Sequence, residues 1–296
     1  MREALAKLFQ QERPGDSQYI VIAVGVTTEL VQDVTADPNQ VLNTLESKHF
    51  ERLFLASKKQ SMDGDLRIFQ TNLENVRDAC RSKDPACKMK KAMLPSEARK
   101  IAASERVENE AFLGQLRAAV QVLSRGKERR TMILVSDGFH LVPGTEAYEL
   151  MQAYFPELPG GFETVDRMPE LEPILRLAAN NNIPIYTIDA RGLYTPGFLN
   201  ASTRGPGIGK AMSTSEQEAG NALHEIAAAT GGTAFQNSND ILSGLQRAFA
   251  DGREYYVLSY VPSSSNADGK FHSISVQLRN TKLLVQAKRG YWADSN

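Results

Sequence analysis

Two apolar runs in this sequence each lead directly to an acidic residue. Residues 131–135 read Thr-Met-Ile-Leu-Val and continue into Ser136-Asp137-Gly138, and residues 183–188 continue into Asp189. Short runs of this kind, rich in β-branched residues, predict strands that are buried on both faces. Ligands and ions bind at the carboxyl ends of strands in open α/β sheets. We therefore expect Asp137 and Asp189 to share one rim of a parallel sheet.

The rim residues also allow an enzymatic interpretation. Ser136, His140 and Asp189 could form a hydrolase triad, but Ser136 is followed by Asp and lacks the GxSxG turn of such nucleophiles. The segment 205–210 looks like a phosphate-binding loop, yet Arg204 stands at its first glycine position. That spacing predicts a flexible loop instead. No residue is expected to be catalytic or to bind a cofactor.

Composition excludes several classes of partner. The chain has 296 residues, 42% of them hydrophobic, which is enough to bury a large core. Its 34 basic and 35 acidic residues give a net charge of −1, so no overall field recruits nucleic acid. The apolar runs are shorter than the roughly 20 residues of a membrane helix. Glu3 and Lys7 interrupt the apolar pattern of the first nine residues, which predicts an amphipathic helix and not a signal peptide.

The two cysteines, Cys80 and Cys87, lie in a short polar segment. A metal site would require more Cys or His at ligand spacing, and none of the four histidines is suitably clustered. A local disulfide would imply an oxidising compartment. Two reduced surface thiols are the alternative, and the residues alone leave both open.

Periodicity and turn signals predict alternating strands and helices, and therefore an α/β sandwich with a mostly parallel central sheet flanked by helices. The prolines and glycines of residues 142–168 indicate a lid-like insertion. The expected strands are 18–26 and 29–35 as a hairpin, 131–135, 183–189, 233–236, and a C-terminal antiparallel extension of 254–261, 271–279 and 282–288. The expected helices are 1–9, 38–47 with Asp37 as its cap, 73–80, 96–124, 169–181, 215–230 and 239–250.

Seven short motifs occur in an order that resembles the von Willebrand factor type A-related proteins of the acidobacterial type. The motifs are Arg13-Pro-Gly-Asp16, Arg130-Thr-Met-Ile-Leu-Val-Ser-Asp-Gly-Phe139, Ile185-Tyr-Thr-Ile-Asp189, Ile226-Ala-Ala-Ala-Thr-Gly-Gly-Thr-Ala-Phe235, Tyr255-Tyr-Val-Leu-Ser-Tyr-Val-Pro262, Asp268-Gly-Lys-Phe271 and Lys288-Arg-Gly-Tyr291. The resemblance implies a Rossmann-like type A domain over residues 1–251, with insertions at 51–95 and 142–168. Residues 252–296 would be an antiparallel extension packed on it. It also implies extracytoplasmic binding or adhesion, which agrees with a disulfide between Cys80 and Cys87.

The resemblance is incomplete where type A domains bind a metal ion. Their divalent ion is held by an Asp-x-Ser-x-Ser loop after the first strand, by a later Thr, and by an Asp after the fourth strand. Asp137 matches only the last of these, and the first strand with its loop has no counterpart. Thr71 is a candidate for the threonine, although a helix cap is the preferred interpretation. Mg²⁺ or Mn²⁺ binding is therefore expected only if a missing upstream segment is present. Without the first strand, strand 18–26 would pair directly with 131–135 or leave an unpaired edge.

These observations predict a non-enzymatic protein-binding or adhesion module. Its recognition face would combine the rim around Asp137, the loop 191–214 and the insertion 142–168. The expected partner is a protein, with no nucleic acid and no membrane span, and the expected location is extracytoplasmic or secreted. The alternatives are a hydrolase using Ser136, His140 and Asp189, and a metal-free scaffold protein of the cell envelope.

Overall fold

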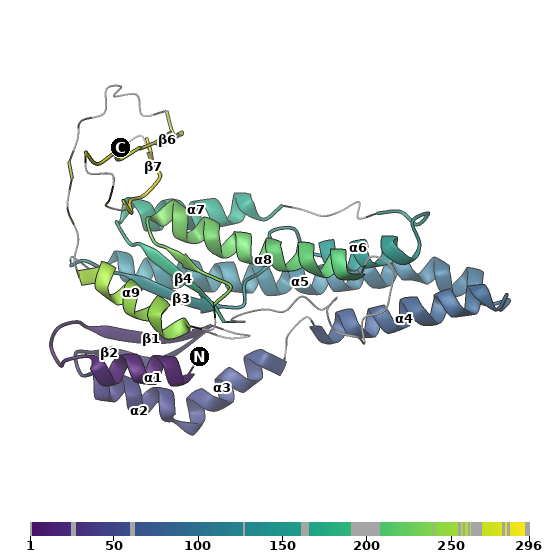
Figure 1. Ribbon diagram of the computed structural model, residues 1–296, viewed down its shortest axis with the longest axis horizontal. Coiled ribbons are helices and arrows are strands. Elements are labelled where there is room, and N and C mark those ends of the chain that lie inside the picture. The colour runs from purple at the N-terminus through teal and green to yellow at the C-terminus, as the bar shows by residue number, and fades with distance from the viewer. Residues whose placement is uncertain are drawn as a thin grey trace.

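A computed structural model shows an elongated α/β fold, in which helices surround a small parallel sheet (Figure 1). The structure describes residues 2–24, 28–59, 63–126, 128–160, 166–190, 208–238, 240–253, 256, 258–259, 261, 268–279, 282 and 285–293. The described helices are α1 (Arg2–Gln11), α2 (Pro38–Glu46), α3 (Lys48–Lys59), α4 (Asp63–Arg81), α5 (Cys87–Ser124), α6 (Thr145–Tyr154), α7 (Met168–Asn180), α8 (Ile208–Thr230) and α9 (Ile241–Arg253). The described strands are β1 (Tyr19–Val24), β2 (Thr28–Thr35), β3 (Met132–Ser136), β4 (Ile185–Asp189), β5 (Ala234–Phe235), β6 (Phe271–Ser273) and β7 (Gly290–Trp292).

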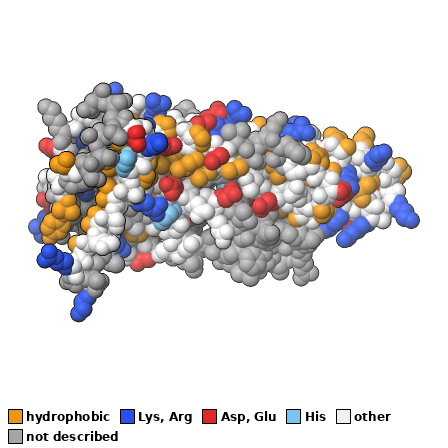
Figure 2. Space-filling model, turned by 90° about the horizontal axis from the view of Figure 1, so that it is seen from above, with side chains coloured by type: hydrophobic (Ala, Val, Ile, Leu, Met, Phe, Trp, Pro, Cys, Tyr) orange, Lys and Arg blue, Asp and Glu red, His pale blue; other side chains and the backbone are white. Residues whose placement is uncertain are grey.

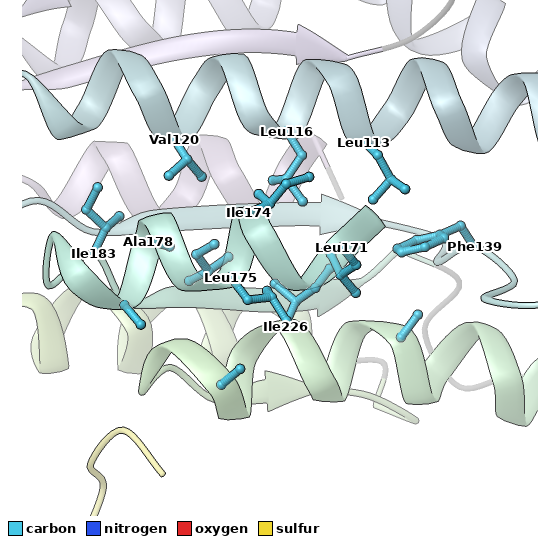
Figure 3. Close-up of a cluster of buried hydrophobic side chains, with 14 of the residues drawn as sticks. Leu113, Leu116, Val120, Phe139, Leu171, Ile174, Leu175, Ala178, Ile183 and Ile226 are labelled. Carbon is cyan, nitrogen blue, oxygen red and sulfur yellow. The ribbon is translucent and has the colours of Figure 1, made fainter. Parts of the chain in front are cut away.

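The parallel sheet has the strand order β3-β4-β5 and carries helices on both faces. On one face, Leu116 of α5 and Leu175 of α7 belong to a buried cluster that also includes side chains of α8 (Figure 3). On the other face, Leu8 of α1 and Leu245 of α9 pack against Ile188 of β4. Burial of each such side chain contributes about 1.5–3 kcal/mol relative to its exposed state. The predicted α/β class is therefore confirmed, with a smaller sheet than expected.

Strand β3 is half-buried along its whole length, whereas β4 beside it is fully buried. The predicted hairpin is confirmed, since β1 and β2 pair with each other in a separate antiparallel sheet. Within the described ranges β3 pairs with β4 alone. Direct pairing of strand 18–26 with 131–135 is therefore wrong, and the prediction of an open edge on β3 holds for these residues.

The segment 142–168 is not lid-like, because its centre is the helix α6. Leu150 and Met151 of α6 are buried in a cluster with Leu73 of α4 and Ala98 of α5. The prolines of this segment lie on either side of α6 and do not interrupt it. Helix α5 also begins nine residues earlier than expected and contains Pro95, so the α4–α5 pair extends well beyond the sheet in Figure 1.

The C-terminal strands are shorter than predicted. Only β6 and β7 are strands in the described part of residues 254–293, and residues 285–288 have no regular structure. Trp292 of β7 packs on α7, where its Nε1 donates a hydrogen bond to Glu172 Oε1 at 3.2 Å. Leu278 and Val285 remain 43% exposed. An alternating pattern does not make a strand where no neighbouring surface covers its apolar side.

None of the helices in the described ranges combines the length and the apolar content that crossing a membrane requires.

Candidate functional site at the carboxyl ends of β3 and β4

The predicted rim exists, because β3 and β4 run in parallel and end together. Ser136 pairs in register with Asp189, and the backbone N–H of Ala190 donates to the Ser136 carbonyl at 2.8 Å. The Asp137 side chain is exposed at this rim, whereas Asp189 is only 4% exposed. The two carboxylates therefore share one end of the sheet but differ in their access to a ligand.

The turn after β3 depends on a glycine. The backbone N–H of Gly138 donates to Ser136 Oγ at 3.1 Å, and Gly138 has a φ of +89°. A Cβ added at this position would lie 2.6 Å from the carbonyl oxygen of Ala219 in α8. Only glycine combines this backbone conformation with so close an approach to a helix. The packing of α8 thus sets the path of the chain that presents Asp137.

A buried polar cluster lies next to this turn. His140 is 4% exposed, and its Nδ1 lies 3.6 Å from Oε2 of Glu105 in α5. The same Glu105 oxygen accepts a hydrogen bond from the backbone N–H of Gly144 at 2.6 Å. Asn109, one turn further along α5, donates to the His140 carbonyl at 2.7 Å. Helix α5 therefore holds both ends of the segment that links the rim to α6.

Carboxylates from three helices determine the charge of His140. Burial lowers the pKa of His140, but its contact with Glu105 and the charges of Glu105, Glu146 and Glu218 outweigh burial and raise the pKa above 6.5. Burial raises the pKa of Glu218; His140 opposes this effect, and Glu149 and Glu105 add to it. The protonated imidazole thus neutralises charge where α5, α6 and α8 meet.

The residues of the hydrolase interpretation lie at one end of the sheet, where Ser136 and His140 each contact other groups. Ser136 Oγ accepts the hydrogen bond that closes the turn at Gly138. The His140 ring faces the glutamates of three helices, with Glu105 as its nearest carboxylate in an ion pair. These contacts shape the turn and join the helices.

A divalent ion of the type A kind would need several oxygen ligands at this rim. Among the residues that the structure describes, no group of three or more His, Cys, Asp or Glu side chains could hold a metal ion. Asp137 is the one predicted ligand at the rim, and the Ser136 hydroxyl is used within the turn. The described residues therefore do not fit the ion.

Two further predicted parts of the site are Thr71 and the loop 191–214. Thr71 is in the interior of α4, where its Oγ1 donates to the carbonyl of Arg67 at 2.9 Å. It is thus not a helix cap, because its helix begins eight residues before it, and α4 as a whole lies beyond the end of the parallel sheet (Figure 1). Of the predicted loop 191–214, residues 191–207 lie outside the described residues, and the remainder belongs to α8.

Cys80 and Cys87 are joined by a disulfide at the end of the α4–α5 pair, with a Cα–Cα distance of 4.9 Å. Cys80 is at the end of α4 and Cys87 is the first residue of α5. The bond therefore closes the turn between these two helices.

Sequence reasoning missed the glutamates around His140. A signal existed in α5, where Glu105 and Asn109 are four residues apart on the same helix face as the buried Ile101 and Leu113. Polar residues on an apolar helix face are buried only when they have partners. That pattern could have identified the α5 side of the cluster, but not the residues that meet it.

Comparisons with protein-family models, with curated proteins and with solved structures each found no match for this chain.

Proposed function

We propose that this chain is a non-enzymatic protein-binding module with a fold of the von Willebrand factor type A kind, and that its ligand binds at the rim around Asp137. The observation that carries the proposal is the difference between the rim side chains. Asp137 is exposed, whereas His140 and Asp189 are buried and Ser136 is engaged in its own turn. An exposed carboxylate on a rigid rim suits recognition of a partner, since a fixed charge contributes specificity and steers association.

Two features support the wider assignment. The parallel sheet between two layers of helices is compatible with a type A fold. The disulfide between Cys80 and Cys87 supports a location in an oxidising, extracytoplasmic compartment.

The binding part is tested by affinity capture with immobilised wild type, Asp137→Ala and the control Asp78→Ala, whose carboxylate is exposed on α4 away from the rim. The expected result is a protein that wild type and the control retain and that Asp137→Ala loses. Capture of the same proteins by all three would refute a role for the rim.

The metal and enzyme alternatives need separate measurements. Titration calorimetry with Mg²⁺ and Mn²⁺ on wild type and Asp137→Ala is expected to give equal, negligible heats. Metal binding by wild type that Asp137→Ala abolishes would instead support a metal site at the rim. Hydrolysis of an ester panel that Ser136→Ala abolishes would instead support the hydrolase.

A further inference from the structure

Helix α5 carries two apolar faces. One packs in the core through residues such as Leu94, Ile101 and Leu116. The opposite face, here called the outer face of α5, is exposed and is also largely apolar or small. Its apolar or small members at helical spacing are Met89, Met93, Ser96, Ala103, Val107, Ala111, Gly114, Ala118 and Val122, and the exposed Lys100 lies among them.

A solvated helix face normally carries polar and charged side chains. Met89 is 65% exposed and Val107 is 64% exposed. The outer face extends from Met89 to Val122, about 50 Å at 1.5 Å per residue. The surface at Gly114 is open, since a Cβ added there would meet no atom within 4 Å. At the narrow end of the molecule, hydrophobic side chains reach the surface beside Lys and Arg (Figure 2). Extended apolar surfaces of this kind mark interaction sites.

The two halves of the outer face differ in side-chain size. The first half presents Met89 and Met93, and the second half presents Ala111, Gly114 and Ala118. If two copies of α5 lay antiparallel, the methionines of each would cover the small residues of the other. A parallel pair would place methionines against methionines and leave the small residues apart, which packs less densely.

Charge favours the same direction. Lys100 is exposed in the first half and Glu108 is exposed in the second half. Partial burial, together with the neighbouring carboxylates of Glu105 and Asp65, raises the pKa of Glu108, so a nearby cation would stabilise its charged form. Antiparallel helices bring Lys100 of each copy near Glu108 of the other. Parallel helices would bring like charges together, which is unfavourable.

We propose that the outer face of α5 binds the same face of a second copy of this chain, with the two helices antiparallel. A twofold axis close to Ser104 relates the copies, so each residue of the first half meets the second half of its partner. Such an arrangement closes on itself and gives a dimer.

Sedimentation velocity of the full chain tests the charge pairing. Wild type is expected to dimerise, Lys100→Glu to weaken the dimer at least about tenfold through like-charge contacts, and the swap Lys100→Glu with Glu108→Lys to restore it. Lys48→Glu, an exposed lysine on α3, is the control and should leave the dimer unchanged. A wild type that stays monomeric up to about 100 µM, a concentration at which a specific dimer would form, overturns the proposal.

A second pair of variants tests the apolar contact. Val107→Lys should abolish the dimer, whereas Ile68→Lys, at a position 68% exposed on α4, should leave it intact. Circular dichroism is expected to show that both variants fold like wild type. A dimer that survives Val107→Lys would place the interface elsewhere.

Cross-linking distinguishes the two directions. Near the twofold axis, Ser104→Cys should cross-link to itself in the dimer with a short bismaleimide. Met93→Cys should not, because the two positions 93 of an antiparallel pair lie tens of ångströms apart at 1.5 Å per residue. A parallel pair would place both positions beside their own copies, so efficient linking of Met93→Cys, with or without linking of Ser104→Cys, contradicts the antiparallel arrangement.

Discussion

Gly138 and Gly15 offer a matched test of how α8 shapes the rim. Both glycines have a φ near +90°, +89° for Gly138 and +87° for Gly15. A Cβ on Gly138 would lie 2.6 Å from the backbone oxygen of Ala219, whereas a Cβ on Gly15 would meet nothing within 4 Å. Alanine at either position therefore has the same backbone strain, and only alanine at position 138 also pushes against a helix.

The expected costs follow from these contacts. Gly15→Ala should reduce the free energy of unfolding by about 1–2 kcal/mol, the cost of a left-handed conformation for a residue with a Cβ. Gly138→Ala should cost about 1–3 kcal/mol more, because the helix backbone of α8 must shift to accept the methyl group. The total for Gly138→Ala is then about 2–5 kcal/mol.

Urea denaturation followed by circular dichroism measures both variants. The midpoints should fall by clearly different amounts, with slopes equal to that of wild type. Equal losses of stability within about 0.5 kcal/mol would refute the argument, since they would mean that the contact with α8 does not constrain the turn. A loss at Gly138 without any loss at Gly15 would instead refute the strain estimate.

Three further outcomes are expected. The folded-state pKa of His140 is raised above 6.5, so the stability that its charged form contributes is complete below about pH 6.5 and is lost as the pH rises through the folded-state pKa. Urea midpoints should therefore fall between pH 6 and pH 8.5. His140→Gln should flatten this dependence of the midpoint on pH. Replacing Cys80 and Cys87 together by Ser, which opens a loop with a sequence separation of 7, should cost about 2.5 kcal/mol, and a variant with an unchanged unfolding midpoint would contradict this. Burial, with a hydrogen bond to Glu12, raises the pKa of Tyr19 to about 12, so the difference in absorbance at 295 nm between wild type and Tyr19→Phe should show no ionisation below about pH 11.

Helices and strands that depend on residues close together in the chain were predictable from the sequence. The run 131–135 became β3 because β-branched apolar residues suit a strand between two helical layers. Asp37 caps α2 as expected, since its side chain accepts a hydrogen bond from the backbone N–H of Asn39 at 2.9 Å, and Pro38 begins the helix. The position of Asp137 at the end of β3 follows from the same reasoning.

Helices and strands that depend on packing against segments far apart in the sequence were not predictable in this way. The prolines around α6 indicated a loop, yet Leu150 and Met151 form a helix face that is covered by α4 and α5. The alternation in residues 282–288 indicated a strand, but residues 285–288 have no regular structure and Val285 is 43% exposed. Pattern alone does not reveal whether such a face finds a partner.

The sequence by itself therefore determined the strands of the rim and the position of Asp137 at the end of β3, because each depends on residues close together in the chain. Only the tertiary structure decided that His140 would meet Glu105 and that Gly138 would pack on Ala219. It also decided that α5 would bury one apolar face and leave the other exposed. The physical reason is that these contacts join segments far apart in sequence, and their energies depend on burial and distance, which arise only when the helices pack around the sheet.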